Sequence, residues 1–308
     1  ITGGMGFIGL HTARRFLDMG EDVVITYFQT WREPSFIKDE FGKRVQVEKV
    51  DVTDGAALTE VVKKHKVDGI VDLVAPGLGK LPPGEDLWVN TAGLHAILEA
   101  AREGQVKRVT LASSLVVYFN CPEEGPWRED LKLPIESPNP TATWKKAWEI
   151  MGLHYAERAE LDLICVRIGG FWGPLYHSMS SLNSRMANAA ARGEELDLNP
   201  EAGIRAGFAH AGGGVPFEDD GMDLCYVKDG ARAIQLLHMS DSLNHKIYNI
   251  GGGGSRSNKD LLTAVQKAAP GFSVELQKGK GPMYKANNYM DMSRIKNDVG
   301  FVPEYTVE

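Results

Sequence analysis

The spacing of glycines at the start of the chain is its most specific chemical signal. Residues 1–9 read ITGGMGFIG, and residues 4–9 also satisfy G-x-G-x-x-G. Glycine permits positive φ and lets the backbone approach a phosphate closely, and the amide groups of a following helix point at the anion. The chain has 34 glycines, so the pattern alone is weak. We expect contacts from Gly3, Gly6, Phe7, Ile8 and Gly9.

The residues that follow this loop strengthen the interpretation. Residues 12–17 have a helical pattern, Gly20 ends that helix, and the apolar run 23–25 predicts the next strand. A dinucleotide site requires this order of strand, turn, helix and strand. The sequence therefore predicts a nucleotide-binding loop rather than a merely structural turn.

Two residues near the end of the strand at 23–27 bear on the choice of dinucleotide. In NAD-binding folds an acidic residue at this place holds the ribose 2′-hydroxyl, whereas this chain has Tyr27 there, followed by Arg32. The missing acid removes repulsion against a 2′-phosphate, with which Arg32 could pair. Alternatively, Arg32 is a solvated loop charge. We expect NADP, with NAD as the second choice.

Further contacts with the cofactor are expected after the next two strands. Asp51 and Val52 close one of them, and Asp51 could accept a hydrogen bond from the adenine amino group or only cap the following turn. Ala75 and Pro76 end the other strand and would pass beneath the cofactor.

The elements that must position these residues alternate along the first half of the chain. Apolar, β-branched runs predict strands at 23–27, 45–50, 69–74, 109–112, 163–167 and 246–250, with helices at 10–19, 56–65, 87–103 and 259–268. This alternation is typical of a doubly wound, Rossmann-type α/β fold with a parallel sheet covered on both faces. We expect residues 1–174 and 226–251 to form the dinucleotide-binding domain. Residues 175–225 and 252–308 would form a smaller mixed α/β substrate lobe.

Bulk properties exclude several classes of function. A net charge of −7 argues against nucleic acid or an anionic membrane as a partner. No run of about 18 apolar residues predicts a membrane span, and no secretory signal is visible. Cys121, Cys165 and Cys225 are odd in number and widely spaced, so neither a disulfide framework nor a metal site is expected. These features favour a reducing cytoplasm. The missing initiator Met suggests residues before Ile1 that would complete the first strand.

Five later segments, taken with the glycine loop, resemble one family nearly end to end. They are TLASSLVVY at 110–118, PTATWKKAWE at 140–149, VRIGGFWGP at 166–174, LCYVKD at 224–229 and YNIG at 248–251. Their order resembles the extended short-chain dehydrogenase/reductases, the NAD-dependent epimerase/dehydratase family. The resemblance implies a bound dinucleotide, with Gly169 among its contacts. It also implies a homodimer formed through helices at 87–103 and 141–158.

The resemblance also implies a catalytic set, from which one member is missing. The family uses a Ser or Thr, a Tyr, and a Lys four residues beyond the Tyr. Ser114 matches the serine, and Lys145 matches the lysine because Lys145, Ala147 and Glu149 reproduce the K-x-A-x-E spacing. The tyrosine position then holds Thr141, and a register based on Lys146 would place Ala142 there. The chain is thus an atypical member.

The lost phenol matters because a threonine hydroxyl does not ionise near neutral pH, whereas a nearby ammonium lowers the pKa of a phenol. Three explanations compete. Another group could move the proton, or Ser114 and Thr141 could relay it through an ordered water, or the protein could bind its cofactor without turnover. The alternative donors considered are Tyr118, Tyr176, His177, His210 and Tyr226.

The expected substrate lobe lacks two anion-binding side chains that nucleotide-sugar enzymes of the family often carry. Gly170 replaces an asparagine and Met222 replaces an arginine. These replacements predict a pocket that suits a less anionic, more apolar substrate. The pocket would be lined by residues 171, 172, 176, 179 and 222; alternatively, these residues form the core of the lobe. Residues 212–214, three glycines, could form a mobile entrance loop or a simple turn.

The main hypothesis is an NADP-preferring oxidoreductase acting on a carbonyl or secondary alcohol of a small or aromatic, non-nucleotide substrate. Ser114 would orient the substrate oxygen, Lys145 would hold the ribose, and Thr141 would only donate a hydrogen bond. The alternatives are a nucleotide-sugar epimerase or dehydratase with a remodelled site, a catalytically silent NADP-binding protein, and a lyase or isomerase that uses the cofactor transiently.

Overall fold

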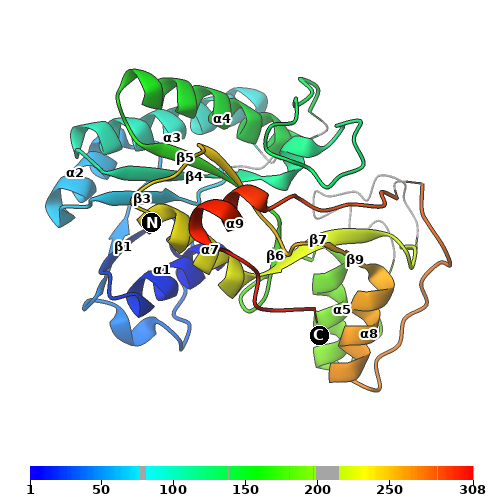
Figure 1. Ribbon diagram of the computed structural model, residues 1–308. Helices are drawn as coiled ribbons and strands as arrows, with labels where there is room; N and C mark the ends of the chain where they lie inside the picture. The colour runs from blue at the N-terminus through cyan, green and yellow to red at the C-terminus, as the bar shows by residue number, and fades with distance from the viewer. Residues whose placement is uncertain are drawn as a thin grey trace.

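A parallel sheet forms the centre of the computed structural model, which describes residues 1–76, 81–137, 139–179, 181–196, 198, 215–282 and 284–307 (Figure 1). Its strands are β1 (Val23–Tyr27), β2 (Val45–Lys49), β3 (Gly69–Asp72), β4 (Arg108–Ser114), β5 (Leu163–Ile168) and β8 (Ile247–Ile250). β1 pairs with β2, and the other four run in the order β3-β4-β5-β8.

Residues 1 and 2 join these two groups of strands. Thr26 donates its backbone N–H to the Ile1 carbonyl at 3.0 Å, and Thr2 donates its own to the Val71 carbonyl at 3.0 Å. The extended Ile1–Thr2 segment therefore lies between β1 and β3, and the glycine loop follows directly from it.

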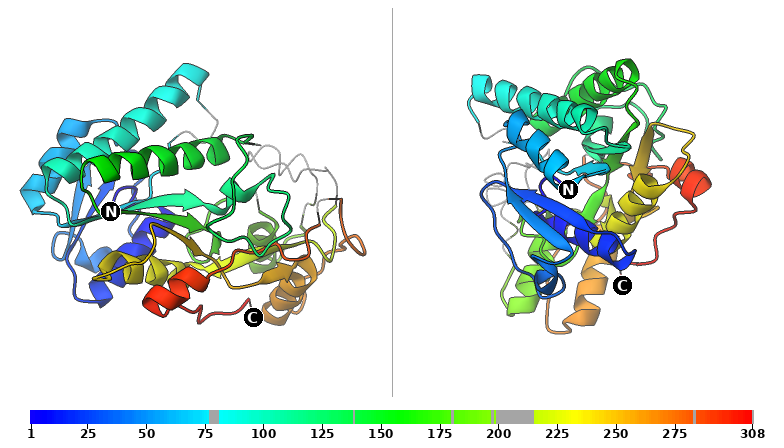
Figure 2. Two further views of the ribbon diagram at one scale, coloured as in Figure 1. Left: turned by 45° about the horizontal axis from the view of Figure 1, so that its top comes forward. Right: turned by 90° about the vertical axis from the view of Figure 1, so that its left-hand side faces the viewer.

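Helices cover both faces of the sheet, as its apolar strands require. α1 (Phe7–Asp18) and α7 (Val227–Met239) pack together on one face, whereas α2 (Gly55–His65), α3 (Pro83–Glu103) and α4 (Pro140–Arg158) cover the other. Figure 2 shows the two long helices α3 and α4 side by side on the outside of the molecule. The short 3-10 helices η1 (Lys38–Glu40) and η2 (Leu115–Tyr118) follow β1 and β4. The doubly wound α/β fold is confirmed.

A smaller lobe has its own sheet and helices. β6 (Gly170–Trp172) pairs in parallel with β7 (Gly221–Tyr226), which pairs in antiparallel with β9 (Ser255–Ser257). α5 (Leu182–Arg192) packs against α8 (Asn258–Ala268) beside this sheet. The lobe therefore mixes helices and strands, as expected.

The last helix, α9 (Ser293–Val299), returns to the main sheet and packs against β8 and α7. Ile295 and Phe301 are buried in the same core as α1 and α7. Part of the segment that the sequence assigns to the lobe thus lies with the dinucleotide-binding domain, because its apolar side chains complete that core.

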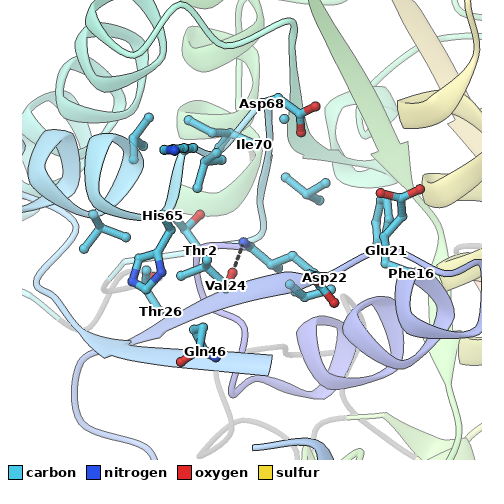
Figure 3. Close-up of a pocket in the computed structure, with 18 of the residues that line it drawn as sticks. Thr2, Phe16, Glu21, Asp22, Val24, Thr26, Gln46, His65, Asp68 and Ile70 are labelled. Carbon is cyan, nitrogen blue, oxygen red and sulfur yellow. Dashed lines mark hydrogen bonds between the residues drawn. The ribbon is translucent and has the colours of Figure 1, made fainter. Parts of the chain in front are cut away.

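A cavity of about 570 Å³ opens at the amino ends of the strands, between β1 and β3 (Figure 3). Val24, His65 and Ile70 are among its lining residues. Ligands of doubly wound sheets bind at the opposite, carboxyl edge, so this cavity is not the expected cofactor cleft. In the described part of the chain, no helix is long and apolar enough to cross a membrane.

Candidate cofactor and active site

The glycine loop has the geometry of a phosphate cradle. Gly3 has a φ of +64°, and a Cβ placed on Gly9 would lie 2.5 Å from the Gly3 carbonyl oxygen. The N-cap residue of α1 is Gly6, which has no side chain that could bind the amides of the first turn. These amides and the positive end of the helix dipole suit a diphosphate. The backbone here fits the dinucleotide that the sequence predicts.

Tyr27 ends β1 and Arg32 lies in the loop that follows, where the sequence predicts the adenosine ribose to bind. The Tyr27 ring packs edge-on against Trp31, with 5.1 Å between ring centroids. Arg32 is half-buried, and among the described residues its side chain forms no hydrogen bond or ion pair. The guanidinium therefore remains available for an anionic group.

The other expected cofactor residues follow strands that end at the same edge of the sheet. Asp51 accepts hydrogen bonds from the Thr53 backbone N–H at 2.9 Å and from the Thr53 hydroxyl at 2.8 Å. This turn-capping role is the alternative considered from the sequence. Val52, Ala75, Pro76 and Gly169 also follow β2, β3 and β5.

Ser114 and Lys145 are brought together because α4 packs against β4 and η2. Ser114 ends β4 and accepts a hydrogen bond from the Val116 backbone N–H at 3.3 Å. The Lys145 Nζ donates to the Ala112 carbonyl at 2.7 Å. Thr141 lies half-buried in the first turn of α4, one turn before Lys145.

The burial of Lys145 controls its charge. Its side chain is buried, which lowers its pKa to about 8, and the nearby Asp72 carboxylate partly opposes this effect. Lys146 instead donates to the carbonyls of Pro134 at 2.5 Å and Glu136 at 2.9 Å, in the preceding loop. These contacts support the register in which Lys145, not Lys146, belongs to the site.

Tyr118 is placed in the core rather than in a cleft. Its side chain is 0% exposed; its hydroxyl donates to Asn249 Oδ1 at 2.8 Å and accepts from Arg167 at 2.8 Å. Burial raises the pKa of this phenol to about 12. These contacts favour a structural role over the proton-transfer role considered from the sequence.

The remaining proton-donor candidates are spread over the lobe and its borders. Tyr176 packs on Phe7, with ring centroids 5.1 Å apart, and Tyr226 packs on Tyr305 at 4.6 Å. His177 is exposed. His210 and the glycines at 212–214 lie outside the described residues. No single replacement for the phenol stands out among these groups.

The structure places most of the residues from which the sequence predicts a less anionic substrate pocket. A Cβ on Gly170 would lie 2.5 Å from the Asp223 carbonyl oxygen, so the close pairing of β6 with β7 excludes an asparagine there. Phe171 is buried in the main core, and Met222 packs against the core of the lobe. Trp172 is half-buried and Met179 is exposed.

Sequence reasoning missed several buried polar residues, three of which bear on the candidate site. Asp72 ends β3, and Asn183 and Ser184 lie in the first turn of α5. Asp72 interrupts the apolar run GIVDLV, a signal that could have singled it out. Among the described residues, no group of three or more His, Cys, Asp or Glu side chains could hold a metal ion.

The doubly wound sheet with a glycine loop at its carboxyl edge defines a dinucleotide-binding α/β protein. The chain belongs to the NAD dependent epimerase/dehydratase family, whose model matches residues 1–251. This membership confirms the resemblance seen in the sequence.

Individual relatives and solved structures agree with this assignment. UDP-glucose 4-epimerase of Lacticaseibacillus casei is 27% identical over 281 residues, which cover 87% of this chain and 80% of the relative. The crystal structure of Thermotoga maritima UDP-glucose 4-epimerase with UDP-glucose has a TM-score of 0.79 at 18% identity, covering 99% of this chain and 93% of that one. Bacillus anthracis dTDP-glucose 4,6-dehydratase in complex with NAD has a TM-score of 0.77 at 21% identity, covering 99% and 91%.

Proposed function

We propose that this protein binds a nicotinamide dinucleotide at the glycine loop and acts on the sugar of a nucleotide-sugar, as an epimerase or dehydratase. The proposal is supported by the place of three features at the carboxyl edge of the sheet: the glycine loop packs against Leu73 and Val74 after β3, Ser114 ends the neighbouring β4, and Lys145 binds the Ala112 carbonyl of β4. The comparisons give no support to the non-nucleotide substrate expected from the sequence. The nucleotide-sugar alternative fits the relatives better.

The chain's own residues have distinct parts in this proposal. A bound nicotinamide supplies a hydride acceptor and donor for a sugar carbon. Ser114 orients the reacting hydroxyl, and the Lys145 ammonium holds the ribose of the cofactor. Thr141 donates a hydrogen bond to the substrate oxygen but does not ionise. Orientation then contributes more to catalysis than general acid help does.

We propose that the first turn of α5 replaces the missing anion-binding side chains at positions 170 and 222. Among the described residues, the Asn183 Oδ1 and the hydroxyls of Ser181 and Ser184 are buried without hydrogen-bond partners. A helix amino terminus with unpaired polar groups suits a diphosphate. Buried polar atoms without partners are costly, so a polar ligand would stabilise them.

We propose that the site binds NADP as well as NAD. Position 27 holds a tyrosine instead of an acidic residue, and the Arg32 side chain forms no ion pair among the described residues, so both features tolerate a 2′-phosphate. A 2′-phosphate would gain a charge-assisted contact with Arg32. Structural neighbours contain NAD, so we expect NAD to bind and Arg32 to add affinity for the phosphorylated form.

We also propose a homodimer. Leu87 and Trp88 of α3 and Ile150 and Met151 of α4 are exposed on helices that pack together. A second copy that covers these side chains would bury apolar surface otherwise facing water.

The test measures cofactor binding and turnover in wild-type protein, Lys145→Ala and Lys107→Ala. Lys107 is an exposed lysine just before β4, at the opposite end of that strand, and serves as the matched control. NAD and NADP are titrated by fluorescence, and UDP-glucose and dTDP-glucose are then supplied and their products separated. We expect Lys145→Ala to weaken cofactor binding by about tenfold or more, as the loss of a charge-assisted contact implies, and to abolish turnover.

Equal cofactor affinity in wild type and Lys145→Ala would contradict the placement of Lys145. Tight cofactor binding without product from either sugar nucleotide would favour a binding protein without turnover. The observation that favours this second candidate function, cofactor binding without turnover, is the threonine at position 141 in place of a tyrosine.

A further inference from the structure

A buried carboxylate lies beside the carbonyl that Lys145 binds. Asp72 ends β3, and its side chain is 1% exposed. In the parallel register Asp72 is the partner of Leu111 on β4, and the next residue, Ala112, accepts the hydrogen bond from Lys145. Register partners direct their side chains to the same face of a sheet.

That face is the one covered by α4. Leu111 packs in the same core cluster as Trp148 of α4, and a Cβ on Gly152 of α4 would lie 3.3 Å from the Leu111 side chain. Asp72 therefore points from β3 toward the helix that carries Lys145. Sequence position gives no indication of this meeting, because 72 residues of chain separate the two groups.

The hydrogen-bond partners of Asp72 are uncharged, and no arginine pairs with its carboxylate among the described residues. Its Oδ1 accepts hydrogen bonds from the Thr2 hydroxyl and, at 3.3 Å, from the Val74 backbone N–H. The amine that faces it is that of Lys145. Burial raises the pKa of the Asp72 carboxyl, and the Lys145 amine partly opposes this change.

The other carboxylate near Lys145 is already compensated. Glu149 binds Arg167 through two nitrogens, at 2.9 and 2.7 Å, and accepts a further hydrogen bond from Ser113. Lys145 also lies 4.3 Å from the centre of the Trp148 ring. A buried ammonium without an opposite charge tends to lose its proton. Among the carboxylates that favour the charged Lys145 amine, Asp72 has the larger effect and Glu149 the smaller one.

We propose that Asp72 is a positioning residue that keeps the buried Lys145 amine protonated and held against β4, where it can meet the ribose of the dinucleotide. This inference rests on the proposed function. With no phenol at position 141 whose ionisation it would assist, the ammonium serves to bind and orient the cofactor. Asp72 acts only through Lys145 and does not itself touch the ligand.

The pH dependence of cofactor binding tests this role. Lys145 faces Asp72 of β3, Glu149 of α4 and Cys165 of β5, and it is charged below its pKa of about 8. Burial lowers that pKa and Asp72 opposes the lowering, so Asp72→Asn must lower it further. As the pH rises, we expect Asp72→Asn to lose cofactor affinity with a midpoint about one pH unit lower than that of the wild-type protein. The affinity of the variant should match wild type near pH 6 and be several-fold weaker near pH 8.

Asp86→Asn is the matched control for this experiment. Asp86 lies on α3 and accepts a hydrogen bond from the Trp144 indole of α4 at 2.8 Å, so it supports the same helix without facing the amine. Its replacement should leave the alkaline midpoint unchanged. An equal shift in both variants would mean that general loosening of α4, not the charge of Asp72, sets the profile.

A double-mutant cycle gives a measurement that needs no cofactor. Asp72→Asn, Lys145→Met and the double variant are unfolded in guanidinium chloride at pH 7. If Asp72 and Lys145 interact, the double variant loses less stability than the sum of the losses in the two single variants. It should therefore unfold at a higher denaturant concentration than additive effects would give. Additive effects together with an unshifted pH midpoint would overturn the inference. Coupling in a protein that binds no dinucleotide would support the pair and contradict the proposed function instead.

Discussion

At position 141 a threonine stands where the resemblance drawn from the sequence places the family's proton-transferring tyrosine. Its side chain is half-buried in the first turn of α4, whose preceding residue Asn139 caps the helix by accepting a hydrogen bond from Ala142 at 2.9 Å. Lys145 lies one turn further along. In that register, the first turn of α4 is the backbone that would carry the phenol one turn before the Lys145 ammonium.

Restoring that phenol should raise turnover. In Thr141→Tyr the Lys145 ammonium would lower the pKa of the new phenol, and general acid–base help typically contributes about 10²- to 10⁴-fold. We expect at least a tenfold gain in kcat on a nucleotide-sugar, with little change in cofactor affinity. Thr143→Tyr places a phenol at an exposed position two residues on and serves as the control. A gain in both variants, or in neither, would contradict a proton-transfer deficit at 141.

At the scale of elements, α3 and α4 have two different faces. The inner face of α4 carries Trp148 and Lys145, which lie against β4, whereas the outer faces of both helices expose apolar side chains. Trp88 is 58% exposed and Ile150 is 70% exposed. In the proposed dimer, these exposed side chains of α3 and α4 would be covered by a second copy.

An acidic residue on this outer face should separate the proposed dimer. We expect Ile150→Glu and Trp88→Glu to give a monomer by analytical ultracentrifugation at micromolar concentration, because a buried unpaired charge is costly. Met19→Glu makes the same kind of change at an exposed methionine just after α1 and should leave the dimer intact. A monomeric wild-type protein would refute the proposed interface.

Across the whole molecule, one buried polar network connects the site helix to the carboxyl-terminal segment. Glu149 of α4 binds Arg167 of β5, and Arg167 contacts Tyr118. Tyr118 binds Asn249 of β8, whose amide donates to the Asp291 carbonyl at 2.9 Å. The stability of the fold and the placement of α4 therefore depend on the same set of contacts.

Breaking this network should destabilise the entire chain. In Glu149→Gln the buried Arg167 loses its counter-charge, which typically costs about 3–5 kcal/mol. Asp68→Asn breaks an ion pair with Lys107 whose side chains are 75% and 80% exposed, and such pairs contribute about 0–1 kcal/mol. Guanidinium chloride unfolding should show this difference in the free energy of unfolding. Similar losses for both variants would contradict a special role for the buried pair.

Much of the fold was predictable because its signals are local. Apolar, β-branched runs predicted the six strands of the main sheet, with ends that differ from the observed ones by only a few residues. The glycine loop was predictable for the same reason, since close backbone packing at Gly3 and Gly9 is a property of nine consecutive residues. The return of α9 to the main core was not, because burial of Ile295 depends on distant elements.

The sequence by itself determined the family, the dinucleotide loop and the absence of a tyrosine at position 141, since each depends on residue types at short spacing. Only the tertiary structure decided that Tyr118 belongs to the core and that Asp72 lies on the face of the sheet covered by α4, the helix that carries Lys145. Both outcomes depend on the register of parallel strands and on which helix covers which face. The charge of a buried amine is set by the groups that folding places around it, and no local pattern encodes that surrounding.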